Sequence, residues 1–308
     1  MSEPTTFEVT YDQLFALPVP TPDSSPFYGW YLGDTRFADE TGSSLSKFVG
    51  LSDITLIAQY FVPVSTYDDL NSIRNDLGNE YRLINDIDIT GHEWLPIGDS
   101  SHPFTGIFDG QSYTIYGMNI SEYQHYVGMF AAISNARIAN FTISNASIIF
   151  SAVTFNSDNT YAGFLAGYAS GEQNSIYGVY VTESILQIAE NGGSNLDIGG
   201  LVGQSTTLVL DVENSHVDAS ITSSASLYAT SGGLIGRSTN HTSIISSSNS
   251  GNIYATNYAG GLVGYIWNSS TETFISESYN SGVVQTSSND TNQSISGGLI
   301  GQTSGTTI

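Results

Sequence analysis

The chain has 308 residues, and 6 lysines and arginines stand against 29 aspartates and glutamates, giving a formal net charge of -23. This excess of negative charge opposes binding to polyanions, so we expect no nucleic-acid partner. No window approaches the roughly 18 apolar residues of a transmembrane helix, and residues 1–9 carry no secretion signal. We therefore expect no membrane insertion and an excised piece of a longer extracellular protein, with a cytoplasmic protein as the competing interpretation.

Residues 7–62 are predicted to form a first β unit. Alternation predicts strands in FEVTYDQ at 7–13, FYGWYL at 27–32 and DITLIAQY at 53–60, and a proline-rich extended run follows the first strand. Trp30 lies in the second strand, where we expect core packing rather than stacking on a ligand. With no cysteine in the chain, this unit must be held by packing alone.

Residues 65–78, STYDDLNSIRNDLG, predict the one clear helix. Thr66 followed by Asp69 forms a capping-box pattern, and Gly78 is placed to end the helix. Repeat arrays need a cap over the apolar interior of their first repeat. We expect this helix to cover the N-terminal end of the array that follows.

The segment 81–120 supplies the first repeat and a candidate metal site. Asp86 and Asp88 alternate with isoleucines near the expected end of the array. Two such carboxylates could hold Ca²⁺ through oxygen ligands. The favoured alternative is that they accept hydrogen bonds from turn amides, and we predict no other cofactor.

A pair of glycines sets the period of the rest of the chain. GGLVG or GGLIG occurs at 199–203, 232–236, 260–264 and 297–301, with looser copies at 127–131 and 162–167. One glycine of each copy marks its position: Gly128, Gly163, Gly200, Gly233, Gly261 and Gly298. The intervals between these glycines are 35, 37, 33, 28 and 37 residues, which is typical of a solenoid or a propeller.

A second pattern lies between the glycine pairs. Segments 244–256 and 274–286 each read as strand, Asn-Ser-Gly turn, strand, so one period holds about three short strands. This predicts an all-β fold, a right-handed parallel β-helix of about six coils. A propeller is the weaker alternative, because its recurring Trp-Asp mark is missing. Four leucines should then share one dry column: Leu201, Leu234, Leu262 and Leu299.

These residues carry two family resemblances. The GGLVG and GGLIG repeats, with the lead-in YRLINDIDITGHEWLPIG, resemble the GLUG motif of bacterial surface proteins and of non-catalytic regions of IgA-type metallopeptidases, over roughly residues 64–308. VTYDQ, LPVPTP, FYGWY and DITLIAQY are similar, in that order, to an internalin-type B-repeat whose first hairpin is absent or cut short. The resemblance implies a β-grasp-like module at 1–63, a capping helix and linker at 64–80, and a β-helix at 81–308 that is open at its C-terminus. The zinc motif of the metallopeptidases lies in a catalytic region absent from this sequence, so their activity is not carried over.

No constellation in the sequence predicts catalysis or a metal centre. Asp211 and Glu213 would share a strand face, but such a pair is more typical of a solvated surface. The five histidines form no close-spaced ligand set; they are His92, His102, His125, His216 and His241. We therefore predict no catalytic, cofactor-binding or metal-binding residues. Four aromatic residues are candidates for a sugar platform or for packing between coils: Tyr258, Tyr265, Trp267 and Tyr279.

The predicted function is a non-enzymatic, extracellular cell-surface adhesin or stalk that presents a rigid polar face. Its partner would be a protein or glycan of a host or neighbouring cell. One alternative is a glycan-cleaving β-helix enzyme, because such enzymes cluster carboxylates on one sheet face. A second is a virion or filament component that self-associates end to end.

Overall fold

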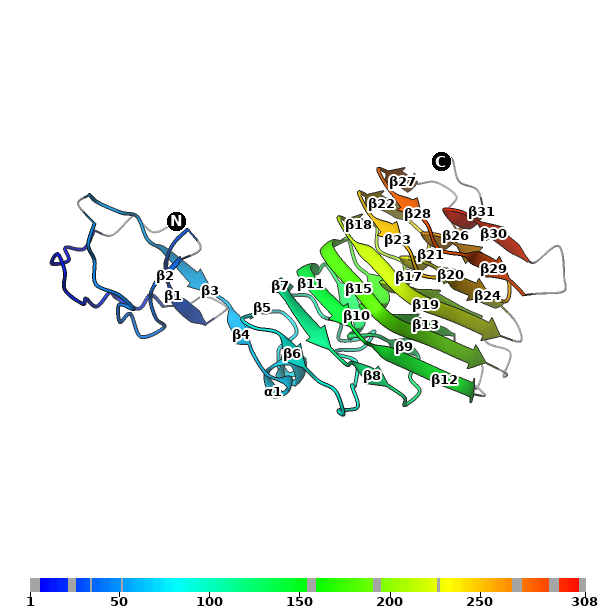
Figure 1. Cartoon of the computed structure of the whole chain (residues 1–308), viewed down its shortest axis with the longest axis horizontal. Helices are drawn as coiled ribbons and strands as arrows, with labels where there is room; N and C mark the ends of the chain where they lie inside the picture. Colours follow the sequence, from blue (N-terminus) through cyan, green and yellow to red (C-terminus); the bar gives the residue numbers. More distant parts are fainter. Residues whose placement is uncertain are drawn as a thin grey trace. The chain divides into compact units, whose positions relative to one another are not determined.

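The computed structural model describes residues 6–21, 26–33, 35–50, 52–153, 159–190, 195–225, 228–267, 273–287 and 294–304. The chain divides into two compact units, Met1–Pro63 with Asn79–Arg82, and Val64–Gly78 with Leu83–Ile308. In both units the regular structure is mainly strand, and in the first unit loops connect a few short strands (Figure 1). Within the described residues, no helix has the length and apolar character that crossing a bilayer requires.

The first unit contains an antiparallel sheet of three strands in the order β2-β1-β3. These strands are β1 (Phe27–Leu32), β2 (Thr35–Ala38) and β3 (Ile57–Tyr60), and β4 (Val62–Val64) follows them. Trp30 packs edge-on against Phe27, with ring centroids 5.8 Å apart, and its indole Nε1 donates to Pro18 O at 2.9 Å. The ring is half-buried and anchored within the unit, as its placement in a strand predicts.

Two of the expected strands of this unit differ from the prediction. Residues 7–13 form no strand: the Gln13 amide donates to Thr10 O and closes a turn in which Asp12 takes a φ of 57°. The third strand begins only at Ile57 instead of residue 53. Alternation alone predicted both, whereas a strand also needs a neighbouring strand to accept its backbone hydrogen bonds. Residues 22–25 of the proline-rich run lie outside the described residues.

The helix opens the second unit and is shorter than predicted. α1 (Tyr67–Ser72) has the expected capping box between Thr66 and Asp69, and a 3₁₀ turn, η1 (Ile73–Asn75), follows it. Asp76 is already extended, so the helical segment ends before Gly78. Buried Leu70 and Ile73 face inward, and contacts to the lead-in fix the helix there: the Tyr67 ring stacks on His92 at 4.0 Å, and Arg74 donates to Leu95 O at 3.0 Å.

The rest of the second unit consists of coils that each pass through three sheets. Sheet I contains β9 (Tyr126–Val127), β13 (Thr160–Gly163), β16 (Asn195–Gly199), β20 (Tyr228–Gly232), β25 (Tyr258–Gly260) and β30 (Ile295–Gly297). Sheet II contains β10 (Phe130–Ser134), β14 (Ala166–Ser170), β17 (Val202–Ser205), β21 (Ile235–Ser238), β26 (Val263–Trp267) and β31 (Ile300–Ser304). Strands of successive coils pair in parallel in both sheets.

Sheet III is larger, because each coil crosses it over a longer path. Its first strands within this unit are β6 (Ile87–Asp88), β7 (Ile107–Tyr116), β8 (Asn119–Ile120), β11 (Arg137–Ser144), β12 (Ser147–Val153) and β15 (Gln173–Glu190). β5 (Glu80–Leu83), most of which belongs to the first unit, precedes them in the sequence. The later coils supply β18 (Val209–Glu213), β19 (His216–Ala225), β22 (His241–Ile245), β23 (Ser248–Asn249), β24 (Ile253–Ala255), β27 (Thr273–Ser276), β28 (Tyr279–Asn280) and β29 (Val284–Thr286). Figure 1 shows the arrows of successive coils side by side and pointing the same way.

The paired-glycine segments stack in the predicted column. The amide of Leu201 donates to Leu234 O, that of Leu234 to Leu262 O, and that of Leu262 to Leu299 O, at 2.8, 2.9 and 2.8 Å. The first three side chains are fully buried, and Leu299, in the last described coil, is 40% exposed. A Cβ on Gly200 would clash with Gly233 O of the next coil and would lie 2.7 Å from the Val217 side chain, so glycine is needed where this segment stacks on its neighbour and approaches sheet III.

The all-β class with parallel sheets is confirmed by these ladders. The last four residues, on which the expectation of an open C-terminal end depends, lie outside the described residues.

Candidate ligand-binding groove

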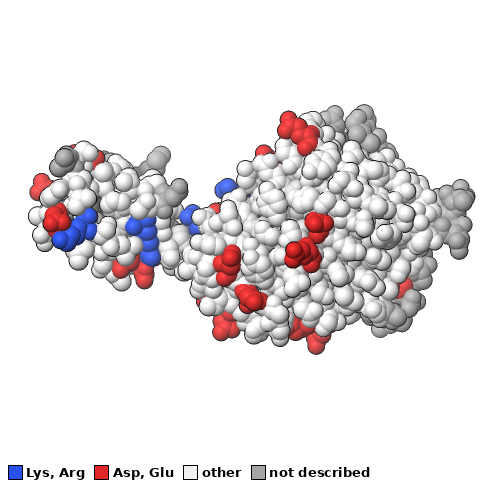
Figure 2. All heavy atoms as spheres, in the orientation of Figure 1, with Lys and Arg blue, Asp and Glu red and all other residues white. Residues whose placement is uncertain are grey.

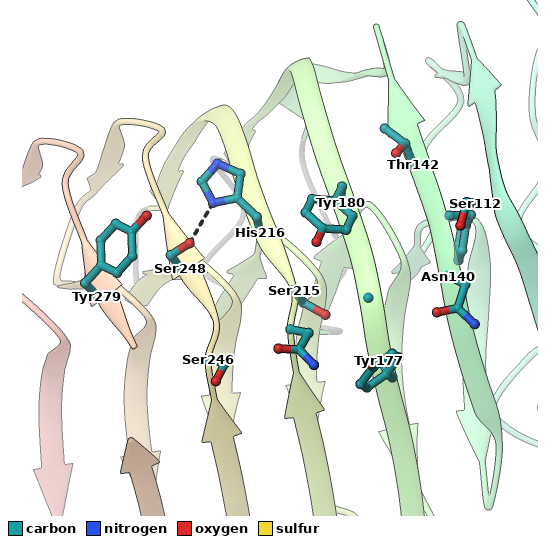
Figure 3. A pocket seen from close by; sticks show the side chains of 13 residues that line it. Ser112, Asn140, Thr142, Tyr177, Tyr180, Ser215, His216, Ser246, Ser248 and Tyr279 are labelled. Atoms are coloured by element: carbon teal, nitrogen blue, oxygen red, sulfur yellow. Dashed lines mark hydrogen bonds between the residues drawn. The ribbon is translucent and has the colours of Figure 1, made fainter. Parts of the chain in front are cut away.

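A row of left-handed residues bends every coil of sheet III at the same place. Each member has a positive φ: Ser112 (67°), Asn140 (60°), Gly178 (61°), Asn214 (49°), Ser246 (49°) and Glu277 (50°). Asparagine and glycine tolerate this conformation better than most residues. Because the coils are in register, the bends lie side by side and form a shallow groove of about 700 Å³ across the strands (Figure 3). We call it the sheet III groove.

One flank of the groove is a single register position repeated in successive coils. Strand pairing aligns Thr142 with Tyr180, Tyr180 with His216, His216 with Ser248, and Ser248 with Tyr279. Figure 3 shows these side chains following one another from strand to strand, with Tyr177 on the other side of the bend. Residues 31 to 38 positions apart in the sequence thus become direct neighbours.

His216 is held by two hydroxyls on the next coil. Its Nδ1 lies 2.8 Å from Ser248 Oγ, the contact drawn in Figure 3, and its Nε2 lies 3.1 Å from Ser250 Oγ. An imidazole and two hydroxyls can each donate and accept. This flank therefore offers a fixed hydrogen-bonding surface.

Three tyrosines border the groove with open rings. Tyr177, Tyr180 and Tyr279 are 41%, 44% and 59% exposed. Within the described residues, neither the rings nor the hydroxyls of these three have a ring contact or hydrogen-bond partner. Their faces and hydroxyl groups are free to contact a ligand.

A serine ladder stiffens the floor of the groove. Ser247 Oγ donates to Ile245 O in its own coil at 2.8 Å and accepts from the Ser215 amide of the preceding coil at 3.1 Å. Ser278 Oγ repeats the arrangement with Ser276 O and the Ser247 amide, at 2.7 and 3.1 Å. The buried amides of Ser215 and Ser247 are thus satisfied by side chains, whereas the amides of Asn214 and Ser246 donate to carbonyls of the next coil.

The residues that line the groove have uncharged side chains. Hydroxyl, amide, imidazole and phenol side chains line it, and none of the lining residues is Asp, Glu, Lys or Arg. The face of the second unit seen in Figure 2 is mainly uncharged, with scattered carboxylates. Two carboxylates are hydrogen-bonded to lining residues: Glu277 accepts from Ser246 Oγ at 3.0 Å, and Asp109 accepts from Asn140 Nδ2 at 3.1 Å.

A second cluster lies where sheets I and II meet. Asp197 is 1% exposed, and its carboxylate lies 3.1 Å from Arg237 Nε. Burial raises the pKa of Asp197 to about 6, although the Arg237 cation acts in the opposite direction. Tyrosines on both sides stack on one another: Tyr161 on Tyr168 at 5.9 Å, and Tyr258 on Tyr265 at 5.3 Å.

The two candidate calcium ligands accept hydrogen bonds from backbone amides. Asp86 Oδ1 accepts from the Thr114 amide at 2.8 Å, and Asp88 Oδ1 from the Thr90 amide at 2.9 Å. Hydrogen bonds from Thr90 lower the pKa of Asp88. The favoured interpretation, bonding to turn amides, describes Asp88, because Thr90 lies in a turn, whereas Thr114 lies in strand β7. Within the described part of the chain, no three His, Cys, Asp or Glu residues are grouped as metal ligands.

The other candidate residues are dispersed. Asp211 and Glu213 both lie in β18, and Asp211 Oδ2 accepts from Gln173 Nε2 at 3.0 Å. Of the five histidines, only His216 lines the groove. Of the four candidate aromatics, Tyr279 borders the groove, Tyr258 and Tyr265 are packed against each other, and Trp267 is 57% exposed.

Sequence reasoning missed Tyr177, Tyr180, His216 and Ser248 as neighbours. The sequence carries a signal for part of this set, because aligning the Asn-Ser-Gly turns of segments 244–256 and 274–286 places Ser248 and Tyr279 in one column. The segments that contain Tyr180 and His216 have no Asn-Ser-Gly turn, so only the strand pairing aligns them with Ser248.

Comparison with known proteins leaves the family open. No family model matches the chain. A 113-residue stretch, 34% of the chain, is 32% identical to an Evansella cellulosilytica protein described as a "Putative Gly-rich membrane protein", and this match spans 13% of that relative's length. A Bacteroides ovatus crystal structure described as "a putative immunoglobulin A1 protease" aligns with 80% of this chain and 84% of its own, at 15% identity and a TM-score of 0.39. At that TM-score the likeness carries no argument about this chain.

Proposed function

We propose that this chain is a ligand-binding, non-enzymatic segment of an extracellular cell-surface protein. In this proposal the second unit is a right-handed parallel β-helix of GLUG-type repeats, and the first unit is a truncated B-repeat module. Right-handedness is supported by the general rule that parallel strands joined through a crossover almost always connect in that sense. The partner is a glycan or protein on a host or neighbouring cell.

The observation that carries this proposal is the sheet III groove. It combines open tyrosine rings with hydrogen-bonding groups held in place by the coil ladders. Exposed aromatics beside polar groups are typical of recognition surfaces. A rigid array of this kind binds without first ordering its own side chains, which would otherwise weaken binding.

The chemistry of the lining favours binding over cleavage. Glycoside hydrolysis uses two carboxyl groups on either side of the scissile bond, and the groove lining contains none. His216 is the one imidazole in the lining, and Ser248 and Ser250 occupy its two ring nitrogens. A glycan-cleaving enzyme is the second candidate; in it, His216 would have to exchange one of these two hydrogen bonds for one to the substrate before acting as acid or base.

Incubating the intact chain with a panel of polysaccharides separates these two functions. Retention of the chain on at least one polysaccharide or on a cell surface, without released sugar products, is the expected result. Reproducible release of products that disappears in His216→Ala would overturn the non-enzymatic assignment. End-to-end self-association is tested by light scattering over a concentration series, where growth of mass with concentration would favour a filament component.

A further inference from the structure

We propose that the sheet III groove binds a neutral oligosaccharide whose chain lies across the coils, perpendicular to the strands. This inference rests on the proposed binding function and narrows it to one class of ligand. It is carried by the spacing of the open tyrosines, the hydrogen-bonding groups between them and the charge of the surroundings.

The tyrosines are spaced for an extended ligand. Tyr180 and Tyr279 occupy the same register position three coils apart, with His216 and Ser248 between them. At about 4.8 Å per coil, the two rings are about 14 Å apart. That separation suits a chain of several sugar rings and is too long for a single monosaccharide. Tyr177 lies on the other side of the bend, where its ring could contact the same oligosaccharide (Figure 3).

The groups between the rings suit sugar hydroxyls. A sugar hydroxyl both donates and accepts, and so do the serine hydroxyls on this flank. Both ring nitrogens of His216 are bonded to Ser248 and Ser250, so the imidazole orients these two hydroxyls before the ligand arrives. On the floor, Asn140 Nδ2 donates to Asp109 Oδ1 at 3.1 Å, which orients its carbonyl oxygen.

Charge decides between neutral and acidic sugars. An acidic polysaccharide would need cations for its carboxylates or sulfates, and no Lys or Arg lines the groove. The net charge of -23 adds long-range repulsion. A neutral chain meets neither penalty.

The tyrosines of sheets I and II are a poorer site, although they are more numerous. Their ring faces are covered by one another, as in the stacked pairs Tyr161–Tyr168 and Tyr258–Tyr265. A sugar ring needs an open aromatic face, which these pairs do not offer. The exposure of the ring faces is therefore a better guide to a sugar-binding site than the number of aromatic residues.

The test is calorimetric titration of the intact chain with hexasaccharides of glucose, mannose, xylose and N-acetylglucosamine, and with a hexamer of galacturonate. At least one neutral hexasaccharide should bind at least tenfold more tightly than the galacturonate hexamer and than its own disaccharide. Tyr180→Ala and Tyr279→Ala should each weaken binding about fivefold to tenfold, the range expected for losing one aromatic contact. Tyr180→Phe should retain most of the affinity, which separates stacking from loss of the hydroxyl.

Tyr254→Ala is the matched control, because Tyr254 is 37% exposed on β24 of the same sheet and does not line the groove. Unchanged affinity in this variant is expected, with melting temperatures compared across all variants. Tighter binding of galacturonate, or no binding of any neutral hexasaccharide, overturns this inference while a cell-surface partner would still support the proposed function. Shortened hexasaccharides after incubation would instead overturn the non-enzymatic function and leave the ligand class standing.

Discussion

At the scale of single residues, Asp197 is the clearest electrostatic feature of the chain. Its folded pKa of about 6 exceeds its ordinary value of 3.8, so the folded state holds a proton over a pH range in which the unfolded state has lost it. The stabilising contribution is therefore complete below about pH 4 and is lost as the pH rises through 6. Its size is on the order of 3 kcal/mol, from two pKa units at 1.36 kcal/mol each. Urea unfolding at pH 4 to 7 should show this decline in the difference between the wild type and Asp197→Asn. A constant difference would contradict the raised pKa.

Arg237 determines how strongly the buried carboxylate of Asp197 destabilises the folded state at neutral pH. Arg237→Gln removes the cation 3.1 Å from Asp197 and leaves a buried charge unpaired, which should lower the free energy of unfolding by about 3–5 kcal/mol at pH 7. The double variant Arg237→Gln/Asp197→Asn should recover much of this loss, because neither charge remains. If the double variant lost as much free energy of unfolding as the two single variants together, Asp197 and Arg237 would not be energetically coupled.

Substitutions at Gly178 test which residue types are tolerated in the row of left-handed residues. Its φ of 61° matches those of Asn140 and Asn214 in neighbouring coils, so Gly178→Asn should change the free energy of unfolding little. Gly178→Val places a β-branched side chain in the left-handed region and should cost about 1–2 kcal/mol. Chemical denaturation of the two variants checks this. Equal losses would mean that contact with Asn140, and not backbone conformation, limits the position.

At the scale of the structural element, the serine ladder joins neighbouring coils. Ser247→Ala leaves the buried Ser215 amide without its acceptor, so the free energy of unfolding should fall by about 1–3 kcal/mol. Ser220→Ala is the control, since Ser220 is exposed on β19 of the same sheet. Hydrogen exchange should show faster exchange at the Ser215 amide in the first variant only. Protection that survives the change would mean that another acceptor replaces the hydroxyl.

At the scale of the whole molecule, the net charge of -23 sets a general response to salt. Screening reduces repulsion among the carboxylates, so raising NaCl from low concentration to about 0.5 M should raise the melting temperature by a few degrees, equivalent to about 1 kcal/mol. Thermal scans in NaCl and in CaCl₂ at matched ionic strength give the comparison. An additional rise in CaCl₂ alone would point to a specific calcium site and against a purely hydrogen-bonding role of Asp86 and Asp88.

Much of the fold was accessible from the sequence, because its signals are local and repeated. The paired glycines and their leucines predicted the column that forms, and Thr66 with Asp69 predicted the cap of α1. Predictions were wrong where a local pattern needed a distant partner. Residues 7–13 alternate like a strand but close a turn, and the helix stops before Gly78, which is three residues past its 3₁₀ turn.

The groove depended on information of another kind. By itself the sequence determined the period, the apolar positions and the excess of acidic residues, because each is a property of composition or spacing. Only the tertiary structure decided that Tyr180, His216, Ser248 and Tyr279 are neighbours, and that Asp197 meets Arg237. The physical reason is that the coils differ in length, so the residues that stand side by side are fixed by the hydrogen-bond register between coils and not by a constant interval in the chain.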